Sequence, residues 1–304
     1  MTRKHSAMPL GLGMVLLAMP RVGTSTDPGK TLRMQVLLDR AHFSPGEIDG
    51  RPGSNSSRAL TAYSKAHGLR EGAAGLRKFL SSDTAPTLVK YTLTEDDVVS
   101  SSGIEIPEDM MEKAKLESLG YASVIEAVAE RFHASPELLR RLNPHATWSS
   151  AGEEVEVPNA RTDPPTGKVV KVIVDASDLS VLTVGPDERV LTRYPASMGS
   201  EFDPLPVGEW KVKGVQRNPP FFYNPDLFWD ADETHAKARI APGPNNPVGV
   251  VWIDLSKEHY GIHGTPEPAS IGKTQSHGCI RLTNWDAADL AGLVTPGLQA
   301  VLRR

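Results

Sequence analysis

The sequence predicts a mainly β domain over residues 168–304, an antiparallel β sandwich or barrel, preceded by small α and α+β modules. From residue 168 onward, short segments rich in β-branched residues alternate with turn residues, as in antiparallel sheets. In front of them, apolar residues recur at helical spacing. A Pro-rich segment, ARTDPPTG at 160–167, lies between the two regions and is expected to be a linker. A chain of 304 residues has room for two or three such units.

Residues 1–27 have the order of a secretory signal peptide. A basic start (Arg3, Lys4, His5) precedes an apolar stretch at residues 8–19, which is shorter than the roughly 20 residues needed to cross a bilayer. We therefore expect an exported protein of the periplasm or cell envelope. The alternative is an uncleaved N-terminal anchor, and no A-x-A cleavage site stands out.

Residues 30–80 predict a helical domain. Apolar residues around Val36 and around Tyr63 flank a turn-rich centre, SPGEIDGRPG, which favours a helix, loop and helix. This arrangement resembles the small three-helix peptidoglycan-binding domain, and the Ile48-Asp49-Gly50 turn is its most specific piece. The sequence departs from that family at Tyr63-Ser64, where Phe-Gln is usual. The resemblance implies binding to the cell wall, and a helical spacer without a ligand is the alternative.

Residues 88–159 predict a second module. Two apolar series in SVIEAVAERFHASPELLRRLNPHA predict two short helices, the second beginning at Ser135. YTL at 91–93 and the alternating EEVEVPN predict a strand at each end. The pattern resembles the lysin motif (LysM), a glycan-binding fold, with an insertion over residues 94–122. A purely structural spacer is the alternative.

The β domain expected after the linker has five clear strands and one helix. The strands are KVVKVIVD, LSVLTV, RVLTRYPAS, VGEWKVKGV and VGVVWIDL. The helix follows Thr283, a capping residue, has Asp286 in its first turn, and is stopped by Pro296. The aromatic-rich segment 216–235 is expected to be either a satellite core or a flap over the site.

Charge and cysteine counts restrict the function. Lys and Arg number 33 and Asp and Glu 37, a formal net charge of -4, so no nucleic-acid partner is expected. Cys279 is the one cysteine, and it cannot form an intramolecular disulfide. An unpaired thiol in an exported protein is a liability unless it is buried or used. Cys279 is therefore the first candidate for chemistry.

The segment IHGTPEPASIGKTQSHGCIRLTNW, residues 262–285, contains His263, His277 and Cys279. A thiol becomes a good nucleophile when its thiolate is favoured, which a nearby imidazole or backbone N–H groups achieve. His277 is two residues from Cys279, so on an extended strand both side chains point to one face. His263 has to be brought close by the fold. The alternative is that the three residues bind zinc, which would make the protein a wall amidase.

HGT at 263–265 and SHGCIRL at 276–282 resemble the signature of the L,D-transpeptidase catalytic domain. The likeness extends from Lys168 to Arg304 and includes YPASMG, LPVGEW and NWDAADL. It implies Cys279 as the acyl-accepting nucleophile and His263 as the general base, without metal or cofactor. It also implies that the backbone carbonyl of Gly264 orients the imidazole in place of a carboxylate.

The resemblance assigns further residues to the site. His277 and Gly278 would support the nucleophile and, with the Cys279 N–H, supply oxyanion-hole donors. Arg281 would hold a substrate carboxylate by a forked contact. Further substrate contacts are expected from Ser276, Tyr260 and Asn284.

The implied reaction is a two-step acyl transfer on peptidoglycan, whose stem peptides and glycan are the expected partners. Cys279 forms a thioester with a tetrapeptide stem and releases D-alanine, and an amine of another stem then takes the acyl group. A lipoprotein lysine or water is a compatible acceptor, so an L,D-carboxypeptidase is an alternative, as is a non-catalytic wall-binding scaffold. The resemblance also implies acylation of Cys279 by carbapenems. The sequence does not indicate the oligomeric state.

Overall fold

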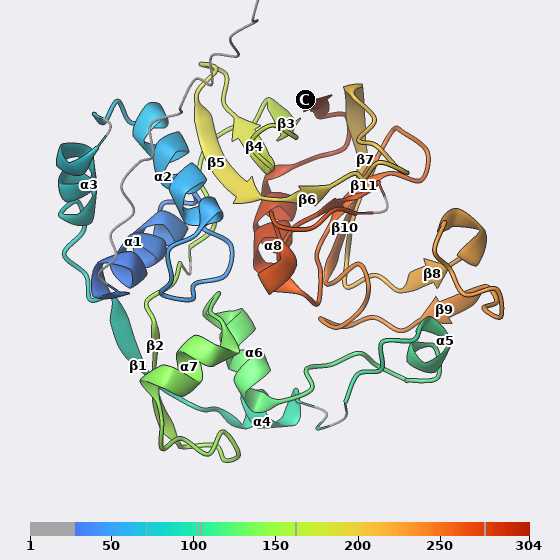
Figure 1. Cartoon of the computed structure of the whole chain (residues 1–304), viewed down its shortest axis with the longest axis horizontal. Helices are drawn as coiled ribbons and strands as arrows, with labels where there is room; N and C mark the ends of the chain where they lie inside the picture. Colours follow the sequence, from blue (N-terminus) through green and yellow to red (C-terminus); the bar gives the residue numbers. More distant parts are fainter. Residues whose placement is uncertain (1–27, 71, 102, 104, 162, 277) are drawn as a thin grey trace, which may run out of the picture.

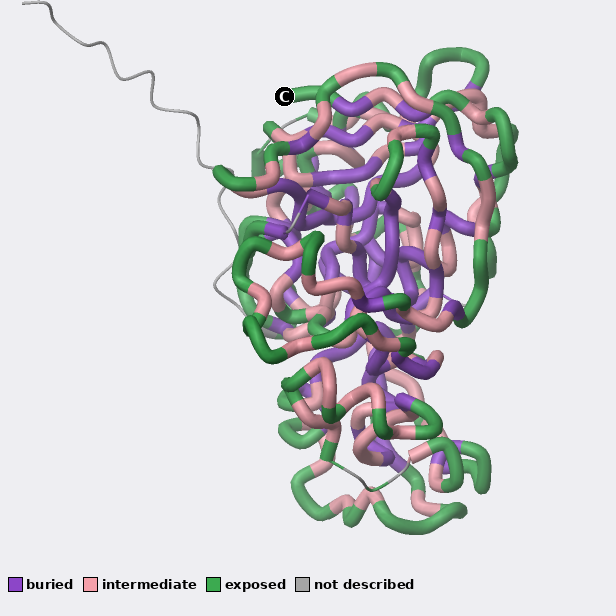
Figure 2. The backbone as a smooth tube through the Cα atoms, turned by 90° about the vertical axis from the view of Figure 1, so that its right-hand side faces the viewer, coloured by how far each residue is buried: buried purple, intermediate pink, exposed green. Residues whose placement is uncertain are grey.

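Three parts follow one another in the computed structural model, which describes residues 28–304 except 71, 102, 104, 162 and 277 (Figure 1). The signal peptide expected at residues 1–27 lies outside the described residues. Figure 2 shows that buried backbone gathers in the interior and exposed backbone lies around it. No helix in the described part of the chain is both long enough and apolar enough to cross a membrane.

The first part contains the two helices predicted from its pattern, α1 (Pro28–Arg40) and α2 (Ser54–Ala66). A third helix, α3 (Ala73–Leu80), is the one that the resemblance implies. They pack around Leu38, Phe43 and Phe79, which are almost fully buried. The predicted turn at 48–50 includes Gly50, whose φ of +70° is a backbone conformation that favours glycine.

The second part has a strand at each end and two helices between, in the predicted order. β1 (Leu88–Thr92) pairs antiparallel with β2 (Glu154–Pro158), and the central helices are α6 (Val124–Arg131) and α7 (Pro136–Leu142). The insertion contains α4 (Glu95–Val99) and α5 (Met110–Lys113). Ser123 and Ser135 cap α6 and α7, because each hydroxyl accepts a hydrogen bond from a first-turn N–H.

The mainly β fold predicted for the third part is confirmed, as a nine-stranded sheet with helix α8 (Asn284–Leu293) packed into its core. The strand order is β5-β4-β3-β13-β7-β10-β11-β12-β6. The strands are β3 (Lys171–Asp175), β4 (Ser180–Val184), β5 (Val190–Pro195), β6 (Ser197–Met198), β7 (Gly208–Arg217), β10 (Val251–Leu255), β11 (Gly261–His263), β12 (Ile280–Arg281) and β13 (Gln299–Arg303).

The sheet is mixed, which corrects the purely antiparallel expectation. β13 pairs parallel with β3, and β11 pairs parallel with β12. The two strands at the ends of the order, β5 and β6, are separated in the chain only by Ala196. Because one continuous segment forms both edges, the sheet must curl until it nearly closes on itself, as in a barrel.

The aromatic-rich segment forms a small separate hairpin of β8 (Phe221–Tyr223) and β9 (Ala238–Ile240). Phe221, Tyr223 and Phe228 pack against the insertion of the second part around Leu119. This contact supports the satellite-core interpretation for the inward-facing aromatics. The outward-facing Phe222 is 70% exposed, and the flap function stays a prediction.

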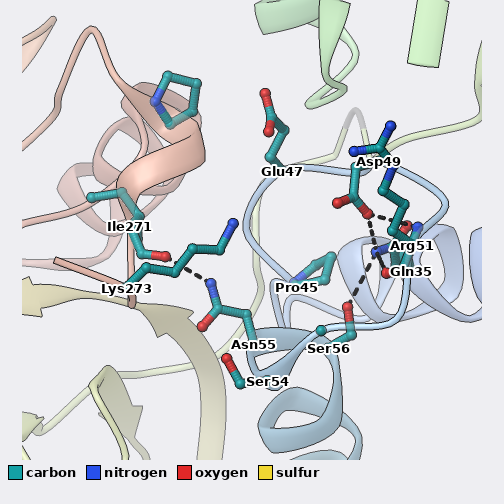
Figure 3. Close-up of a pocket in the computed structure, with 12 residues that line it drawn as sticks. Gln35, Pro45, Glu47, Asp49, Arg51, Ser54, Asn55, Ser56, Ile271 and Lys273 are labelled. Carbon is teal, nitrogen blue, oxygen red and sulfur yellow. Dashed lines mark hydrogen bonds between the residues drawn. The ribbon is translucent and has the colours of Figure 1, made fainter. Parts of the chain in front are cut away.

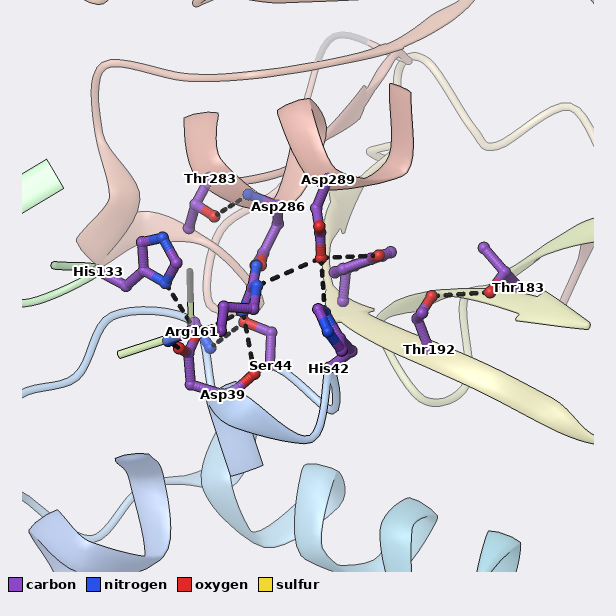
Figure 4. Close-up of polar contacts among 12 residues, drawn as sticks. Asp39, His42, Ser44, His133, Arg161, Thr183, Thr192, Thr283, Asp286 and Asp289 are labelled. Atoms are coloured by element: carbon purple, nitrogen blue, oxygen red, sulfur yellow. Dashed lines mark hydrogen bonds and ion pairs between the residues drawn. The ribbon is translucent and has the colours of Figure 1, made fainter. Parts of the chain in front are cut away.

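The segment expected to be a linker is anchored at Arg161. Arg161 is buried and pairs with three carboxylates, those of Asp39 on α1 and of Asp286 and Asp289 on α8, while His133 of the second part also contacts Asp39 (Figure 4). We call these five residues the inter-module ion network. Arg161 lies 2.7 Å from the Asp286 carboxylate and 3.3 Å from that of Asp289. The network therefore joins all three parts of the chain.

The first and second parts also share backbone hydrogen bonds. The N–H of Ile48 donates to the carbonyl of His133 (2.8 Å), and the N–H of Ser135 donates back to the carbonyl of Ile48 (2.9 Å). Arg141 donates to the carbonyl of Asp49 (2.8 Å). The turn that carries the likeness to peptidoglycan-binding domains is thus also a docking point for the second part.

Candidate active site

The fold brings His263 beside the strand that follows Cys279. In the parallel pair of β11 and β12, Ile262 faces Ile280 and His263 faces Arg281. Ile262 and Ile280 are buried in the core. Because side chains alternate along a strand, His263 and Arg281 project to the opposite face. Cys279 directly precedes β12, so the fold brings the nucleophile expected from the sequence to the end of the strand that pairs with the strand of the expected base.

The Cys279 sulfur contacts backbone groups of His259 and Gly261, at the start of β11. Its thiol donates to the carbonyl oxygen of His259, with a sulfur to oxygen distance of 3.6 Å, and the Gly261 N–H hydrogen-bonds to the sulfur. Burial raises the pKa of the thiol, as does the charge of Asp203, against the opposing effects of Gly261 and Arg281. The described surroundings of Cys279 therefore favour the protonated thiol.

His263 is held as a neutral base. Its Nδ1 lies 2.6 Å from the carbonyl oxygen of Gly264. Because a carbonyl only accepts, Nδ1 carries the proton and Nε2 presents a lone pair. Burial, helped by the charge of Arg281 and opposed by the Gly264 hydrogen bond, lowers the pKa of His263 to about 4. The ring also stacks on Trp252, with centroids 5.4 Å apart.

We expect the rate of Cys279 acylation to have an acid limb near pH 4 rather than near pH 6.5. A base whose pKa is about 4 is neutral, and can accept the thiol proton, at all pH values well above 4. The rate should be flat from about pH 5.5 to 8 and fall as pH drops through 4. Pre-steady-state thioester formation checks this, with circular dichroism at each pH to show that the protein stays folded. An acid limb at pH 6 to 7 would contradict it.

Gly278 and Tyr260 lie together at the turn before Cys279. Gly278 has a φ of +94°, and a Cβ built there would lie 3.0 Å from the Tyr260 hydroxyl oxygen. Neither the conformation nor the space suits a larger residue. Burial raises the pKa of the half-buried Tyr260, and the negative charges of Asp203 and of an ionised Cys279 raise it further. Tyr260 therefore lies beside the turn that leads to Cys279, and its contact with a substrate stays a prediction.

Arg281 lies on the face expected of it, but its guanidinium is partly engaged by its own loop. It donates to the Thr274 hydroxyl (3.3 Å) and to the carbonyl of Gln275. Its buried Nε has no hydrogen-bond partner among the described residues. Arg281 orders the loop between His263 and Cys279, and its contact with a substrate carboxylate stays a prediction.

Ser276 and Asn284, which were expected to contact the substrate, are both buried. Ser276 is 6% exposed and donates to the carbonyl of Cys279 (2.6 Å), so it shapes the turn around the nucleophile. Asn284 is 1% exposed, and its amide bonds only to protein groups in the described part of the chain. Neither side chain is available to a substrate, which corrects that expectation. His277 lies outside the described residues.

Sequence reasoning missed Gly261 and Trp252. A Cβ at Gly261 would lie 2.6 Å from the Trp252 ring, so only glycine lets the indole cover this strand and reach His263. The available signals were a tryptophan in the alternating VVWIDL strand and a glycine directly before IHG. Asp203, whose charge acts on Cys279 and Tyr260, had no sequence signal because it lies in a distant loop.

The loop between His263 and Cys279 is fastened to the first part of the chain. Asn55 of α2 donates to the carbonyl of Ile271 (2.8 Å), and its Oδ1 fills the space where a Cβ of Gly272 would be. Figure 3 shows the small pocket beside this contact, with Glu47 and Asp49 on one side and Lys273 on the other. None of the expected site residues lines the pocket, so it is separate from the candidate active site.

In the part of the chain that the structure describes, no cluster of three His, Cys, Asp or Glu side chains is arranged to hold a metal ion. The zinc alternative included His277, which lies outside that part. Metal analysis of the purified protein tests it: stoichiometric zinc essential for activity would contradict a thiol mechanism.

The third part of the chain is similar to proteins of one family. Residues 170–302 match the L,D-transpeptidase catalytic domain family YkuD. YkuD of Bacillus subtilis (strain 168), which bears the name of an L,D-transpeptidase, is 32% identical over 181 residues, covering 59% of this chain and 93% of that relative. YkuD of Bacillus licheniformis is 30% identical over 175 residues, covering 57% and 89%. The crystal structure of L,D-transpeptidase 3 from Mycobacterium tuberculosis aligns at 17% identity over 51% of this chain and 76% of that chain, with a TM-score of 0.37.

Proposed function

Because the chain belongs to the L,D-transpeptidase family, a family of cysteine-dependent acyltransferases, we propose that it joins peptidoglycan stem peptides through a thioester on Cys279. The observation that carries this proposal is the position of His263 on β11 beside β12, the strand that Cys279 directly precedes, with Nδ1–H of His263 hydrogen-bonded to the Gly264 carbonyl. That arrangement leaves Nε2 as the acceptor for the thiol proton.

In the first step, the Cys279 sulfur attacks the carbonyl at the L-centre of the third-position diamino acid of a tetrapeptide stem. The Cys279 thiol gives up its hydrogen bond to the His259 carbonyl. Its proton passes to Nε2 of His263 as the sulfur to carbon bond forms. Backbone N–H groups at Gly278 and Cys279 are the proposed donors to the oxyanion. The carbon to nitrogen bond then breaks, and His263 returns the proton to the departing D-alanine amine.

In the second step, an amine of another stem attacks the thioester carbonyl. His263 accepts a proton from the attacking nitrogen and returns it to the sulfur as the thioester breaks, which restores the neutral pair. A thiol and a neutral imidazole suit this cycle, because the proton is transferred only when a bond forms. A lipoprotein lysine or water in place of the stem amine would use the same residues.

The two front parts are proposed to bind the wall and raise the local concentration of stems near Cys279. Only two residues follow the matched domain, so an alignment that covers 59% of the chain must extend well in front of residue 170. That extension supports the idea that the second part is shared with the Bacillus relative. Export to the periplasm or envelope, where such stems occur, is part of the proposal and depends on residues 1–27.

Mass spectrometry with a synthetic tetrapeptide stem tests the proposal directly. We expect the intact protein to gain the mass of the stem less D-alanine, with the adduct on the peptide that contains Cys279. Addition of an acceptor amine should discharge the adduct and yield the cross-linked product. An adduct on any other residue, or release of free tripeptide at the same rate with and without acceptor, would contradict the transferase assignment.

A further inference from the structure

Asn284 connects the second part of the chain to the active site. It is the first residue of α8 and lies three residues after Arg281. Its side-chain nitrogen donates to the Glu130 carboxylate on α6 (3.1 Å) and to the carbonyl of Pro244 (3.1 Å). Its side-chain oxygen accepts from the N–H of Val250 (3.2 Å). The amide orientation is therefore fixed by groups on both sides.

The oxygen of this amide lies directly against the backbone that holds His263. A Cβ built on Gly264 would lie 2.2 Å from the Asn284 Oδ1, and one on Gly249 would lie 1.9 Å from it. Gly264 supplies the carbonyl that accepts the hydrogen bond from Nδ1–H of His263. A shift of the Asn284 amide would thus displace that carbonyl, because packed interiors leave no free space between the two groups.

We propose that Glu130, a residue of the second part of the chain, is a positioning residue for the acyl transfer, holding Asn284 so that the Gly264 carbonyl fixes the tautomer of His263. The proposal rests on the proposed function for the reaction it names. It gives the second part a role in the chemistry, beyond any binding of the wall.

The surroundings of Glu130 agree with a carboxyl group placed for this contact. Burial raises the pKa of Glu130 to about 7, and the hydrogen bonds from Asn284 and Tyr121 oppose the rise. Tyr121 donates to the other carboxyl oxygen at 3.3 Å. A buried carboxyl group is costly unless its oxygens are hydrogen-bonded, so each donor matters. One carboxyl oxygen of Glu130 accepts from Tyr121, which lies in the same part of the chain, and the other accepts from Asn284.

The test compares Glu130→Met with Glu130→Gln. Methionine has a similar volume but cannot accept the bond from Asn284, whereas glutamine can accept from Asn284 and donate to the Tyr121 oxygen. We expect kcat for stem transfer to fall about tenfold in Glu130→Met, as for the loss of one buried hydrogen bond, and KM to change by less than about twofold. Glu130→Gln should stay within about threefold of the parent kcat.

A second readout needs no substrate. Long-range proton–nitrogen correlation spectra report the tautomer of His263 in the folded protein. The parent and Glu130→Gln should show Nδ1 protonated and Nε2 unprotonated, and Glu130→Met should show a mixture. Arg131→Met is the matched control, because this neighbour on α6 pairs with Asp97 within the second part (2.9 Å). It should leave both the tautomer and kcat unchanged.

The positioning role is overturned if folded Glu130→Met retains the parent tautomer and kcat, or if Glu130→Gln is as impaired as Glu130→Met. A parent protein that transfers no stem would overturn the proposed function instead. In that case the tautomer comparison still decides whether Glu130 positions His263.

Discussion

Replacing Cys279 by alanine is expected to lower acyl transfer by on the order of 10⁴-fold or more, because removal of the nucleophile leaves only binding and backbone donors. The side chain is half-buried at a turn, and alanine fits its space, so the fold should be unchanged. Stem binding should persist. The measurement is the rate of cross-linked product by liquid chromatography, beside calorimetric binding of the stem.

Cys279→Ser provides the matched control. Serine places a hydroxyl where the thiol was. A hydroxyl proton is harder to remove than a thiol proton, so Cys279→Ser should be nearly as slow as Cys279→Ala. Because the chain has one cysteine, acylation by a carbapenem should disappear in both variants. Turnover equal to that of the parent in Cys279→Ala would rule out the thioester mechanism.

Replacing Arg161 by methionine is expected to destabilise the protein by about 3–5 kcal/mol, the usual effect of removing one partner of a buried ion pair. The carboxyl groups of Asp39 and Asp286 are buried and would lose their shared cation. Urea unfolding at neutral pH measures the change. Arg303→Met is the control: Arg303 pairs with Asp175 but its side chain is 51% exposed, so the change should be about 0–1 kcal/mol.

The ion pair of Arg161 with Asp39 also predicts how the free energy of unfolding changes with pH. Burial would raise the pKa of Asp39, but Arg161 and His133 together lower it to about 2 from 3.8. A depressed folded-state pKa contributes stability that is present above pH 4 and is lost as pH falls towards 2. In Arg161→Met the loss of unfolding free energy at acid pH should be smaller, because the cation that does most to lower the pKa of Asp39 is gone. An equal acid loss in both proteins would contradict the assignment.

The local elements could be predicted because their signals lie within a few residues of one another. Thr283 and Ser135 mark helix starts through capping, and alternation around Trp210 marks a strand. Cys279 and His263 could be paired because the two short motifs that contain them carry a family signature. The parallel pairing of β13 with β3 was not predictable, since it joins strands at opposite ends of the domain.

The remaining features depend on contacts between distant segments. Arg161 appeared to belong to a linker because its partners, Asp39 and Asp286, are each more than 100 residues away along the chain. Asn284 was assigned to the substrate because a motif does not reveal burial. The environment of Cys279 was hidden for a similar reason: the sequence shows a neighbouring imidazole but not the burial that raises the pKa of the thiol.

The anchored segment at Arg161 changes how the front parts can serve the reaction. A flexible connection lets a catalytic domain sweep a volume whose radius grows with connection length. Here the Arg161 guanidinium pairs with carboxylates on both α1 and α8, and backbone hydrogen bonds of Ile48 join the first two parts. The front parts are therefore held at fixed positions relative to the third part. Under the proposed function, a wall segment bound by a front part would be kept at a constant distance from Cys279, which a flexible linker would not provide.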